Sequence, residues 1–261
     1  MHRELSEEIG VDPVDVLPLI RLEHSFPEYR VQLYFFQVVT WRGMPVPRLG
    51  QTLMWKSPQI LPGLPLFAAN RSVVSALRLP RRLLVVSDPA IVNQERFLEQ
   101  LEEVLNSGRA DGVILRIRNT HPDPEWLCRV IKYSAGYPVM CNSGGIVLPT
   151  DGFAGLHLPA GTLKQFRERP EYKGWIGASV HTPVEAEKAR ALGLDYVLIG
   201  NVGPTPTHPG RHPLGWFGFE ELAWTAGLPA YAIGGLHPDD YQLARSHWAQ
   251  GVAGMRAFWG N

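Results

Sequence analysis

The chain has 261 residues, of which 45% are hydrophobic and 19% are charged, and its formal net charge is +0. That balance excludes the basic surface of a protein that binds nucleic acid polymers, and no apolar run reaches the roughly 18 residues of a membrane helix. The N-terminus is charged from Arg3 onward, unlike a signal peptide, and Cys128 and Cys141 have no metal-binding or redox spacing. We therefore expect a globular cytoplasmic protein with reduced thiols.

The first residues predict a short helix that ends at Gly10. Its glutamates Glu4, Glu7 and Glu8 are spaced i, i+3 and i+4, so they share one helix face and repel one another unless a cation lies among them. Hard oxygen ligands of this kind suit Mg2+ or Mn2+. A solvated acidic helix face is the alternative.

The pattern R-E-L-x-E-E-x-G-V over residues 3–11 resembles the second half of the Nudix box. The similarity continues through the predicted strand 31–38, and together these segments resemble the C-terminal half of MutT-type 8-oxo-dGTP diphosphatases. The resemblance implies an α+β Nudix fold, Mg2+ on the three glutamates and a nucleoside triphosphate as substrate. It also implies that Asn70 reads the oxidised guanine base. Capping of the helix predicted over residues 71–77 is an alternative or additional role for Asn70.

The Nudix box should begin with a glycine and a glutamate upstream of Arg3, which the sequence does not contain. We expect that Met1 is not the natural start, and an in-frame stop codon immediately before it would contradict this. Residues 1–77 are then an incomplete sheet with an exposed edge, prone to misfolding and without hydrolase activity as given.

The rest of the chain predicts a barrel. Residues 78–82 place a proline between basic residues at a helix end, which is typical of a linker. From residue 83 to residue 261, short apolar strands alternate with helical segments, the pattern of βα units around a parallel sheet. The predicted strands cover residues 83–88, 110–118, 138–143, 155–159, 175–181, 194–200, 231–236 and 251–256. We expect a (β/α)8 barrel preceded by part of an α+β domain.

Hydroxyl groups and glycines follow the late strands of this barrel. Thr205 and Thr207 come after the strand 194–200, and Gly234 and Gly235 end the next apolar run. In (β/α)8 barrels the usual phosphate site lies in the loops after the seventh and eighth strands. The loops here follow the sixth and seventh predicted strands, next to that usual position, and the sequence predicts a phosphate site in them.

Polar side chains on two earlier strands add to this site. Arg116 and Arg118 share one face of an otherwise apolar strand, which is costly unless an anion meets them, and surface exposure is the alternative. Ser179 and His181 lie near the C-terminal end of a strand, the catalytic face of such barrels. An imidazole there can move a proton near neutral pH, or it can hold a loop in place.

The segments Ser-Val-His-Thr at 179–182, Pro-Thr-x-Thr at 204–207 and Ala-Ile-Gly-Gly at 232–235 make residues 81–261 similar to thiamine phosphate synthases and TenI-type thiazole tautomerases. The resemblance implies that a phosphorylated thiazole or a thiamine phosphate-like molecule is the ligand. The matching residues in this family hold the thiazole phosphate (Thr205, Thr207, Gly234, Gly235) or face the pyrimidine pyrophosphate (Arg116, Arg118, Asn142).

Several positions depart from the synthase pattern. The two metal-binding aspartates are absent, because Ser143 and the run Pro159-Ala160-Gly161 stand in their places, and no cofactor of the barrel follows from the sequence. His208 replaces a lysine, and Arg256 replaces a serine. Synthesis releases pyrophosphate, whose developing charge a metal must balance, so we expect a loss of synthase activity by orders of magnitude. Tautomerisation needs only a phosphate anchor and one proton shuttle, and His181 occupies the matching position.

Three functions remain open at this stage. The barrel is a thiamine-type enzyme, either tautomerase-like or a degenerate synthase. Alternatively, the full-length product is an 8-oxo-dGTP diphosphatase of nucleotide-pool sanitation and DNA repair. The third candidate function is that of a non-catalytic sensor, in which the barrel binds a phosphorylated ligand without converting it.

Overall fold

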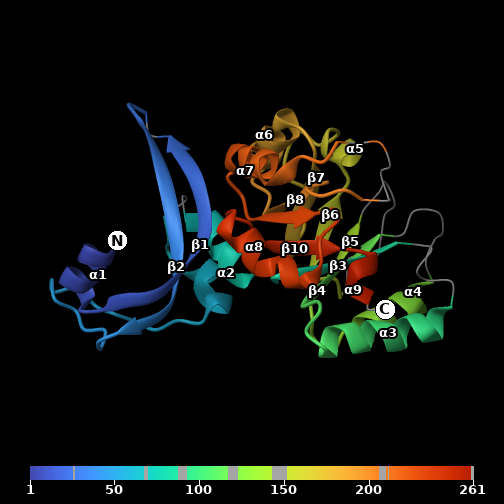
Figure 1. The fold of residues 1–261 in the computed structure, drawn as a ribbon, viewed down its shortest axis with the longest axis horizontal. Helices are drawn as coiled ribbons and strands as arrows, with labels where there is room; N and C mark the ends of the chain where they lie inside the picture. The colour runs from blue at the N-terminus through green and yellow to red at the C-terminus, as the bar shows by residue number, and fades with distance from the viewer. Residues whose placement is uncertain are drawn as a thin grey trace.

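The computed structural model describes residues 1–25, 27–67, 70–87, 93–116, 123–142, 152–205, 210 and 212–259. From Arg82 onward the chain forms a closed barrel of eight parallel strands in the order β10-β3-β4-β5-β6-β7-β8-β9 (Figure 1). The expected (β/α)8 barrel is therefore confirmed.

The barrel strands are short and mostly buried, as their apolar sequences predict. They are β3 (Arg82–Ser87), β4 (Gly112–Arg116), β5 (Val139–Asn142), β6 (Gly155–Leu158), β7 (Trp175–Val180), β8 (Tyr196–Gly200), β9 (Ala230–Ile233) and β10 (Gly251–Gly254). Strands β3 and β9 begin one residue before their predicted ranges, and the other six lie within theirs.

Helices cover the outside of the barrel. They are α3 (Gln94–Asn106), α4 (Pro124–Tyr133), α5 (Ala160–Leu163), α6 (Pro183–Ala191), α7 (Gly215–Ala226), the 3-10 helix η4 (Pro238–Asp240), α8 (Tyr241–Ser246) and α9 (Arg256–Trp259). The start of α6 is fixed by Thr182, whose hydroxyl accepts a hydrogen bond from the Glu185 amide at 3.3 Å. Because this bond satisfies an amide that has no partner within the helix, Thr182 is the N-cap of α6.

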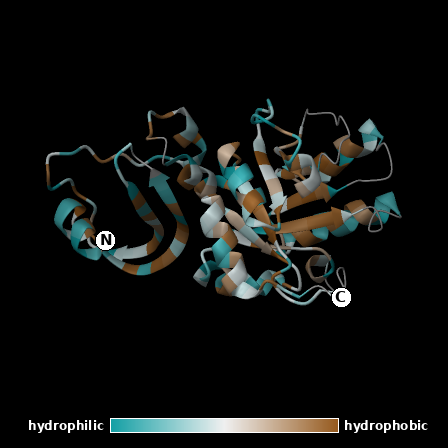
Figure 2. Ribbon diagram, turned by 90° about the horizontal axis from the view of Figure 1, so that it is seen from above, coloured by the Kyte–Doolittle hydropathy of each residue, from teal (hydrophilic) through white to brown (hydrophobic). Residues whose placement is uncertain are grey.

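Two layers of apolar side chains hold the barrel together. The larger cluster lies between the strands and the surrounding helices, and a smaller one fills the barrel interior. Inside, Tyr196 takes the space beside Gly177, where a Cβ atom would come within 2.1 Å of the tyrosine ring. Each leucine, isoleucine or valine buried in these layers contributes about 1.5–3 kcal/mol. Figure 2 shows this concentration of hydrophobic residues along the barrel strands.

The N-terminal part contains helix α1 (His2–Ile9), a two-stranded antiparallel sheet of β1 (Asp12–Ser25) and β2 (Arg30–Arg42), the 3-10 helix η1 (Pro58–Gly63) and helix α2 (Arg71–Arg78). The predicted strand 31–38 is the centre of β2. Strand β1 was not predicted, because Pro13 and Pro18 interrupt its pattern, and register shifts adjoin both prolines.

Aromatic contacts join this hairpin to the barrel. The ring centroid of Trp248 lies 5.7 Å from that of Tyr34 and 5.3 Å from that of Phe36. Arg21 of β1 forms an ion pair with Glu220 of α7 at 3.2 Å. Figure 1 shows β1 and β2 beside α7 and α8. The hairpin is therefore packed on the barrel rather than separated from it.

The predicted linker 78–82 is closely packed against the barrel. Leu79 and Pro80 are buried, and the side-chain amide of Gln250 donates hydrogen bonds to the carbonyls of Leu79 at 3.2 Å and Pro80 at 3.3 Å. The Tyr231 hydroxyl donates a 2.7 Å bond to the same Pro80 carbonyl. Tyr231 of β9 and Gln250, which immediately precedes β10, therefore bind the chain just before β3.

Among the described residues, no helix is both long enough and apolar enough to cross a membrane.

Candidate active site

A cavity of about 660 Å3 opens at the carboxyl ends of the barrel strands, and we call it the mouth cavity. Its wall includes the ends of several strands, among them Arg116 of β4, Gly200 of β8 and Gly254 of β10. It brings together most of the predicted barrel-site residues: Arg116, Asn142, Ser179, His181, Thr205, Gly234, Gly235 and Arg256. Arg118, Thr207 and His208 lie outside the described residues, so their roles stay predictions.

The loop after β9 brings main chain to the cavity wall. Gly234 and Gly235 adopt φ values of +102° and +69°, which L side chains rarely take. A Cβ atom on Gly235 would lie 2.4 Å from the Pro204 carbonyl oxygen, so only glycine fits this close approach. Outside the strand ladders, neither glycine amide donates a main-chain hydrogen bond to another described residue. These amides are donors that suit a phosphate oxygen.

His181 stands at the end of β7 with a defined tautomer. Its Nδ1 atom lies 3.0 Å from the Gly200 carbonyl oxygen, which can only accept, so Nδ1 carries the proton. The Nε2 atom therefore has a free lone pair. The His181 amide donates a 2.8 Å bond to the Glu185 carboxylate. Burial raises the pKa of Glu185, but this bond and the ammonium group of Lys164 lower it by more, so the net shift of the pKa is downward. The lone pair of Nε2 makes His181 able to act as a base.

A buried network lies behind Ser179. The Nε2 atom of His157 is 2.9 Å from the Ser179 Oγ, and its Nδ1 atom is 3.2 Å from the Tyr196 hydroxyl. The Tyr196 hydroxyl has no other acceptor among the described residues, so we assign it as the donor to Nδ1. His157 then donates from Nε2 to Ser179, whose own proton is left to point at a ligand.

Burial keeps this network neutral. It lowers the pKa of His157 to about 3 and raises the pKa of Tyr196 well above its ordinary value. Neither residue was predicted to belong to the site, because both lie within apolar strands. The sequence did offer one signal for His157: a histidine inside the apolar run of β6, two residues after Gly155 and therefore on the same strand face.

The charge of the mouth cavity is one-sided. Its described lining includes Arg116, Arg256 and three histidines, and it contains no aspartate or glutamate. Carboxylate oxygens are the ligands that Mg2+ prefers. The described lining therefore fits an anion and does not fit a magnesium ion on protein ligands.

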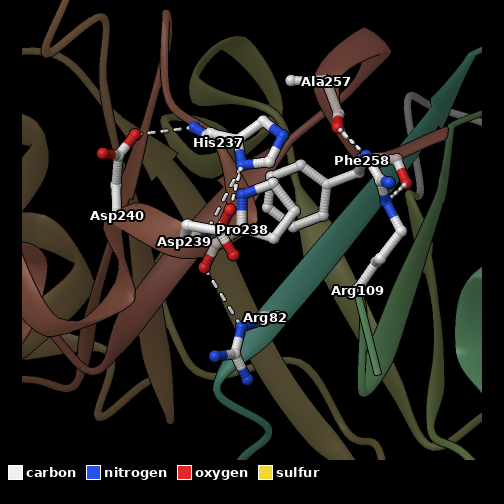
Figure 3. Close-up of polar contacts among 8 residues, drawn as sticks. All are labelled: Arg82, Arg109, His237, Pro238, Asp239, Asp240, Ala257 and Phe258. Carbon is white, nitrogen blue, oxygen red and sulfur yellow. Dashed lines mark hydrogen bonds and ion pairs between the residues drawn. The ribbon is translucent and has the colours of Figure 1, made fainter. Parts of the chain in front are cut away.

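Two arginines hold the C-terminal loops that form part of this wall (Figure 3). Arg82 donates from Nε to the Pro238 carbonyl at 3.1 Å, next to His237. Arg109 donates to the carbonyls of Phe258 at 3.2 Å and Ala257 at 2.9 Å, which lie in the helix that begins at Arg256. The positions of His237 and Arg256 are therefore tied to the barrel body.

The predicted N-terminal site residues lie elsewhere. Asn70 immediately precedes α2 but makes no capping bond through its side chain, so its helix-capping role lacks that contact. On α1, Arg3 pairs with Glu7 at 2.7 Å and lies 3.9 Å from Glu4. Within the described part of the chain, no group of three or more histidine, cysteine, aspartate or glutamate side chains is placed to hold a metal ion. Glu4, Glu7 and Glu8 do not form such a group in this arrangement, and their metal-binding role stays a prediction.

Comparison with known proteins assigns the barrel. A family model described as thiamine monophosphate synthase matches residues 83–258. The thiamine-phosphate synthase of Thermus thermophilus is 32% identical over 186 residues, which cover 69% of this chain and 89% of that protein. The solved thiamine phosphate pyrophosphorylase from Pyrococcus furiosus superposes with a TM-score of 0.50 over 74% of this chain and 90% of its own, at 20% identity, which supports the fold alone.

The N-terminal part has a separate relative. The 8-oxo-dGTP diphosphatase of Buchnera aphidicola is 36% identical over 78 residues, which are 30% of this chain and 63% of that protein. This match is partial, so it does not assign the chain to a family. The family is assigned from the match of residues 83–258 to the family model. The chain belongs to the thiamine monophosphate synthase family.

Proposed function

We propose that the mouth cavity binds a phosphorylated thiazole and catalyses proton transfer on it, as a tautomerase, rather than joining two thiamine precursors. The observation that carries this proposal is the composition of the described lining, which has cations, histidines and hydroxyls but no carboxylate. The family to which the barrel belongs supports such a ligand, and the Thermus thermophilus relative of the barrel is a thiamine-phosphate synthase.

The phosphate is anchored by the glycine loop and by arginine. The amides of Gly234 and Gly235 supply two donors, and Arg116 and Arg256 add charge on the same cavity wall. Charge-assisted hydrogen bonds of this kind are about twice as strong as neutral ones. Asn142, Ser179 and Thr205 complete the polar wall, and Thr207, His208 and Arg118 belong to the same proposed set.

His181 is the proposed proton shuttle. Its Nε2 lone pair takes a proton from one position of the bound thiazole, and the electron pair left behind moves into the ring system. The imidazolium then returns the proton at the second position. Substrate and product therefore have the same molecular formula, and the reaction needs no oxidant or metal. The Ser179 hydroxyl, oriented by His157, donates a hydrogen bond to the ligand.

Synthesis of thiamine phosphate requires a different site. It releases pyrophosphate, and the developing negative charge needs a strong counter-charge such as a metal ion. The described lining does not fit that ion, so no step of the proposed reaction is routed through one.

The test uses the full chain with a phosphorylated thiazole in D2O, with and without EDTA. We expect tautomer conversion and deuterium uptake that EDTA does not change, and no thiamine phosphate when pyrimidine pyrophosphate and Mg2+ are added. His181→Ala should abolish turnover while the ligand still raises Tm. Formation of thiamine phosphate would overturn the proposal in favour of a synthase. Binding without turnover in the unmodified protein would overturn it in favour of a sensor.

The similarity to an 8-oxo-dGTP diphosphatase supports a second candidate activity for the N-terminal part. Because Glu4, Glu7 and Glu8 do not form a group of three side chains placed to hold a metal ion, we propose that these residues do not hydrolyse nucleotides in this chain. Incubation with 8-oxo-dGTP and Mg2+ should leave the nucleotide intact. Release of pyrophosphate from it would assign nucleotide-pool sanitation to this part, with Asn70 as the base-reading residue.

A further inference from the structure

A second cavity, of about 670 Å3, lies between the N-terminal part and the amino end of the barrel, and we call it the junction cavity. Helices η1 and α2 form one wall, and residues that precede or begin β6, β7 and β8 form the other, including Ala154, Trp175 and Asp195. It shares no lining residue with the mouth cavity. The two cavities are therefore separate sites at opposite ends of the barrel.

Positive charge dominates the junction cavity. Its lining contains Arg71, Arg78, Arg169 and Lys173, and the one carboxylate among the described lining residues is Asp195. That carboxylate is already satisfied, because Arg169 binds it at 2.5 Å and the Ile176 amide donates to it at 2.8 Å. Arg71, Arg78 and Lys173 thus have no ion-pair partner in the described part of the chain, and together they favour an anion.

Arg78 adds an unsatisfied donor. Its guanidinium lies 5.7 Å from the centroid of the Trp175 ring, a cation–π distance. Its Nε atom is buried and has no hydrogen-bond partner among the described residues. The guanidinium charge of Arg78 is therefore not neutralised by an acceptor among the described residues, which favours an anion beside it.

The other side of the junction cavity is apolar. Leu61, Leu64 and Val74 line it, and Phe67 at its edge is 86% exposed. An aromatic side chain left this exposed can stack on a planar ring. The cavity therefore offers an apolar, aromatic surface beside the cations Arg71, Arg78 and Lys173.

We propose that the junction cavity binds a phosphate-bearing aromatic ligand of the nucleotide class, with its phosphate at Arg71, Arg78 and Lys173 and its ring against Phe67. The volume falls within the roughly 300–1,000 Å3 typical of ligand pockets. Because one wall comes from α2 and the other from β7, the bound ligand holds the N-terminal part on the barrel. Binding should therefore raise the stability of the whole chain.

The experiment measures binding of GMP to the full chain by isothermal titration calorimetry, with guanosine and inorganic phosphate as probes of the two halves of the ligand. GMP should bind more tightly than either probe. Arg71→Glu and Lys173→Glu replace exposed or partly exposed cations, and each should weaken GMP binding by about tenfold or more. Arg96→Glu on α3 makes the same charge change away from the cavity and should leave binding unchanged.

The location is tested with Arg256→Glu, which alters only the mouth cavity. GMP binding that survives this change but is lost in Arg71→Glu and Lys173→Glu supports the junction cavity. The proposal is wrong if GMP does not bind at millimolar concentration or if guanosine binds as tightly as GMP. Loss of binding in Arg256→Glu, with no effect of Arg71→Glu, would also overturn it.

Discussion

The Nε2 atom of His157 lies 2.9 Å from the Oγ atom of Ser179, deep in the wall of the mouth cavity. Burial makes the imidazole hard to protonate and the Tyr196 hydroxyl hard to ionise, so neither end of the network can hold a charge near neutral pH. The network therefore orients the Ser179 hydroxyl and does not deliver a proton through His157. Proton transfer is left to His181.

The first prediction concerns acid stability. The pKa of His157 is lowered from 6.5 to about 3 in the fold, so below pH 6.5 the unfolded chain binds a proton that the folded protein excludes. This contribution to stability is present above pH 6.5 and is lost as the pH falls toward 3, with an upper bound of roughly 5 kcal/mol. Urea denaturation of the unmodified protein and of His157→Gln between pH 7 and pH 4 should show a shallower pH dependence in the variant. Equal slopes would mean that His157 is not protected from protons.

The second prediction concerns the glycine turn. Gly235→Ala adds a Cβ atom at 2.4 Å from the Pro204 carbonyl and at a φ of +69°, so we expect a loss of about 2–4 kcal/mol and of phosphate binding. Gly108→Ala is the matched control, because Gly108 has a φ of +73° but nothing within 4 Å of its added Cβ. It should cost only about 1 kcal/mol. Thermal denaturation compares the two, and equal losses would show that the close approach to Pro204 is not limiting.

The third prediction concerns the attachment of the hairpin. Trp248→Ala removes the ring that contacts Tyr34 and Phe36, so we expect a loss of about 2–3 kcal/mol and faster proteolysis of residues 12–42. The control is Trp55→Ala, which removes a side chain that is 78% exposed and should change stability by less than about 0.5 kcal/mol. Equal protease sensitivity of the two variants would contradict this role of Trp248.

The fourth prediction concerns the arginine that holds the C-terminal helix. Arg109→Ala removes the donors to the Ala257 and Phe258 carbonyls, which should cost about 1–2 kcal/mol. Arg256 begins that helix, so phosphate binding at the mouth should also weaken. Arg109→Lys keeps the charge but only part of the donor geometry, so its stability should lie between that of the unmodified protein and that of Arg109→Ala. Undiminished phosphate binding in Arg109→Ala would show that Arg109 does not position Arg256.

The sequence was sufficient for the barrel because its strands are apolar runs set between polar helices and glycine turns. The run at 175–181, for example, corresponds to β7 (Trp175–Val180). It was not sufficient for β1, where Pro13 and Pro18 interrupt the local strand pattern and the strand pairs with β2 across register shifts. That pairing is a long-range property, so local propensity does not reveal it.

The same distinction applies to the site. His181 and Gly235 were predictable, because each follows an apolar strand at the catalytic end of the barrel. His157 was not, since its role depends on Ser179 and Tyr196, which approach it from two neighbouring strands. The junction cavity could not be predicted from the sequence either, because Arg78 and Lys173 line it from two distant parts of the chain.

The hydrogen bonds of Gln250 and Tyr231 to the segment before β3 affect how this gene can be divided. Both side chains are 0% exposed, and the carbonyls they bind belong to Leu79 and Pro80, on the N-terminal side of the barrel boundary at residue 83. A barrel transplanted without those residues would carry buried donors with no acceptors. A division of the gene at that boundary would therefore remove acceptors on which the barrel depends, so Leu79 and Pro80 belong to the folding unit of the barrel.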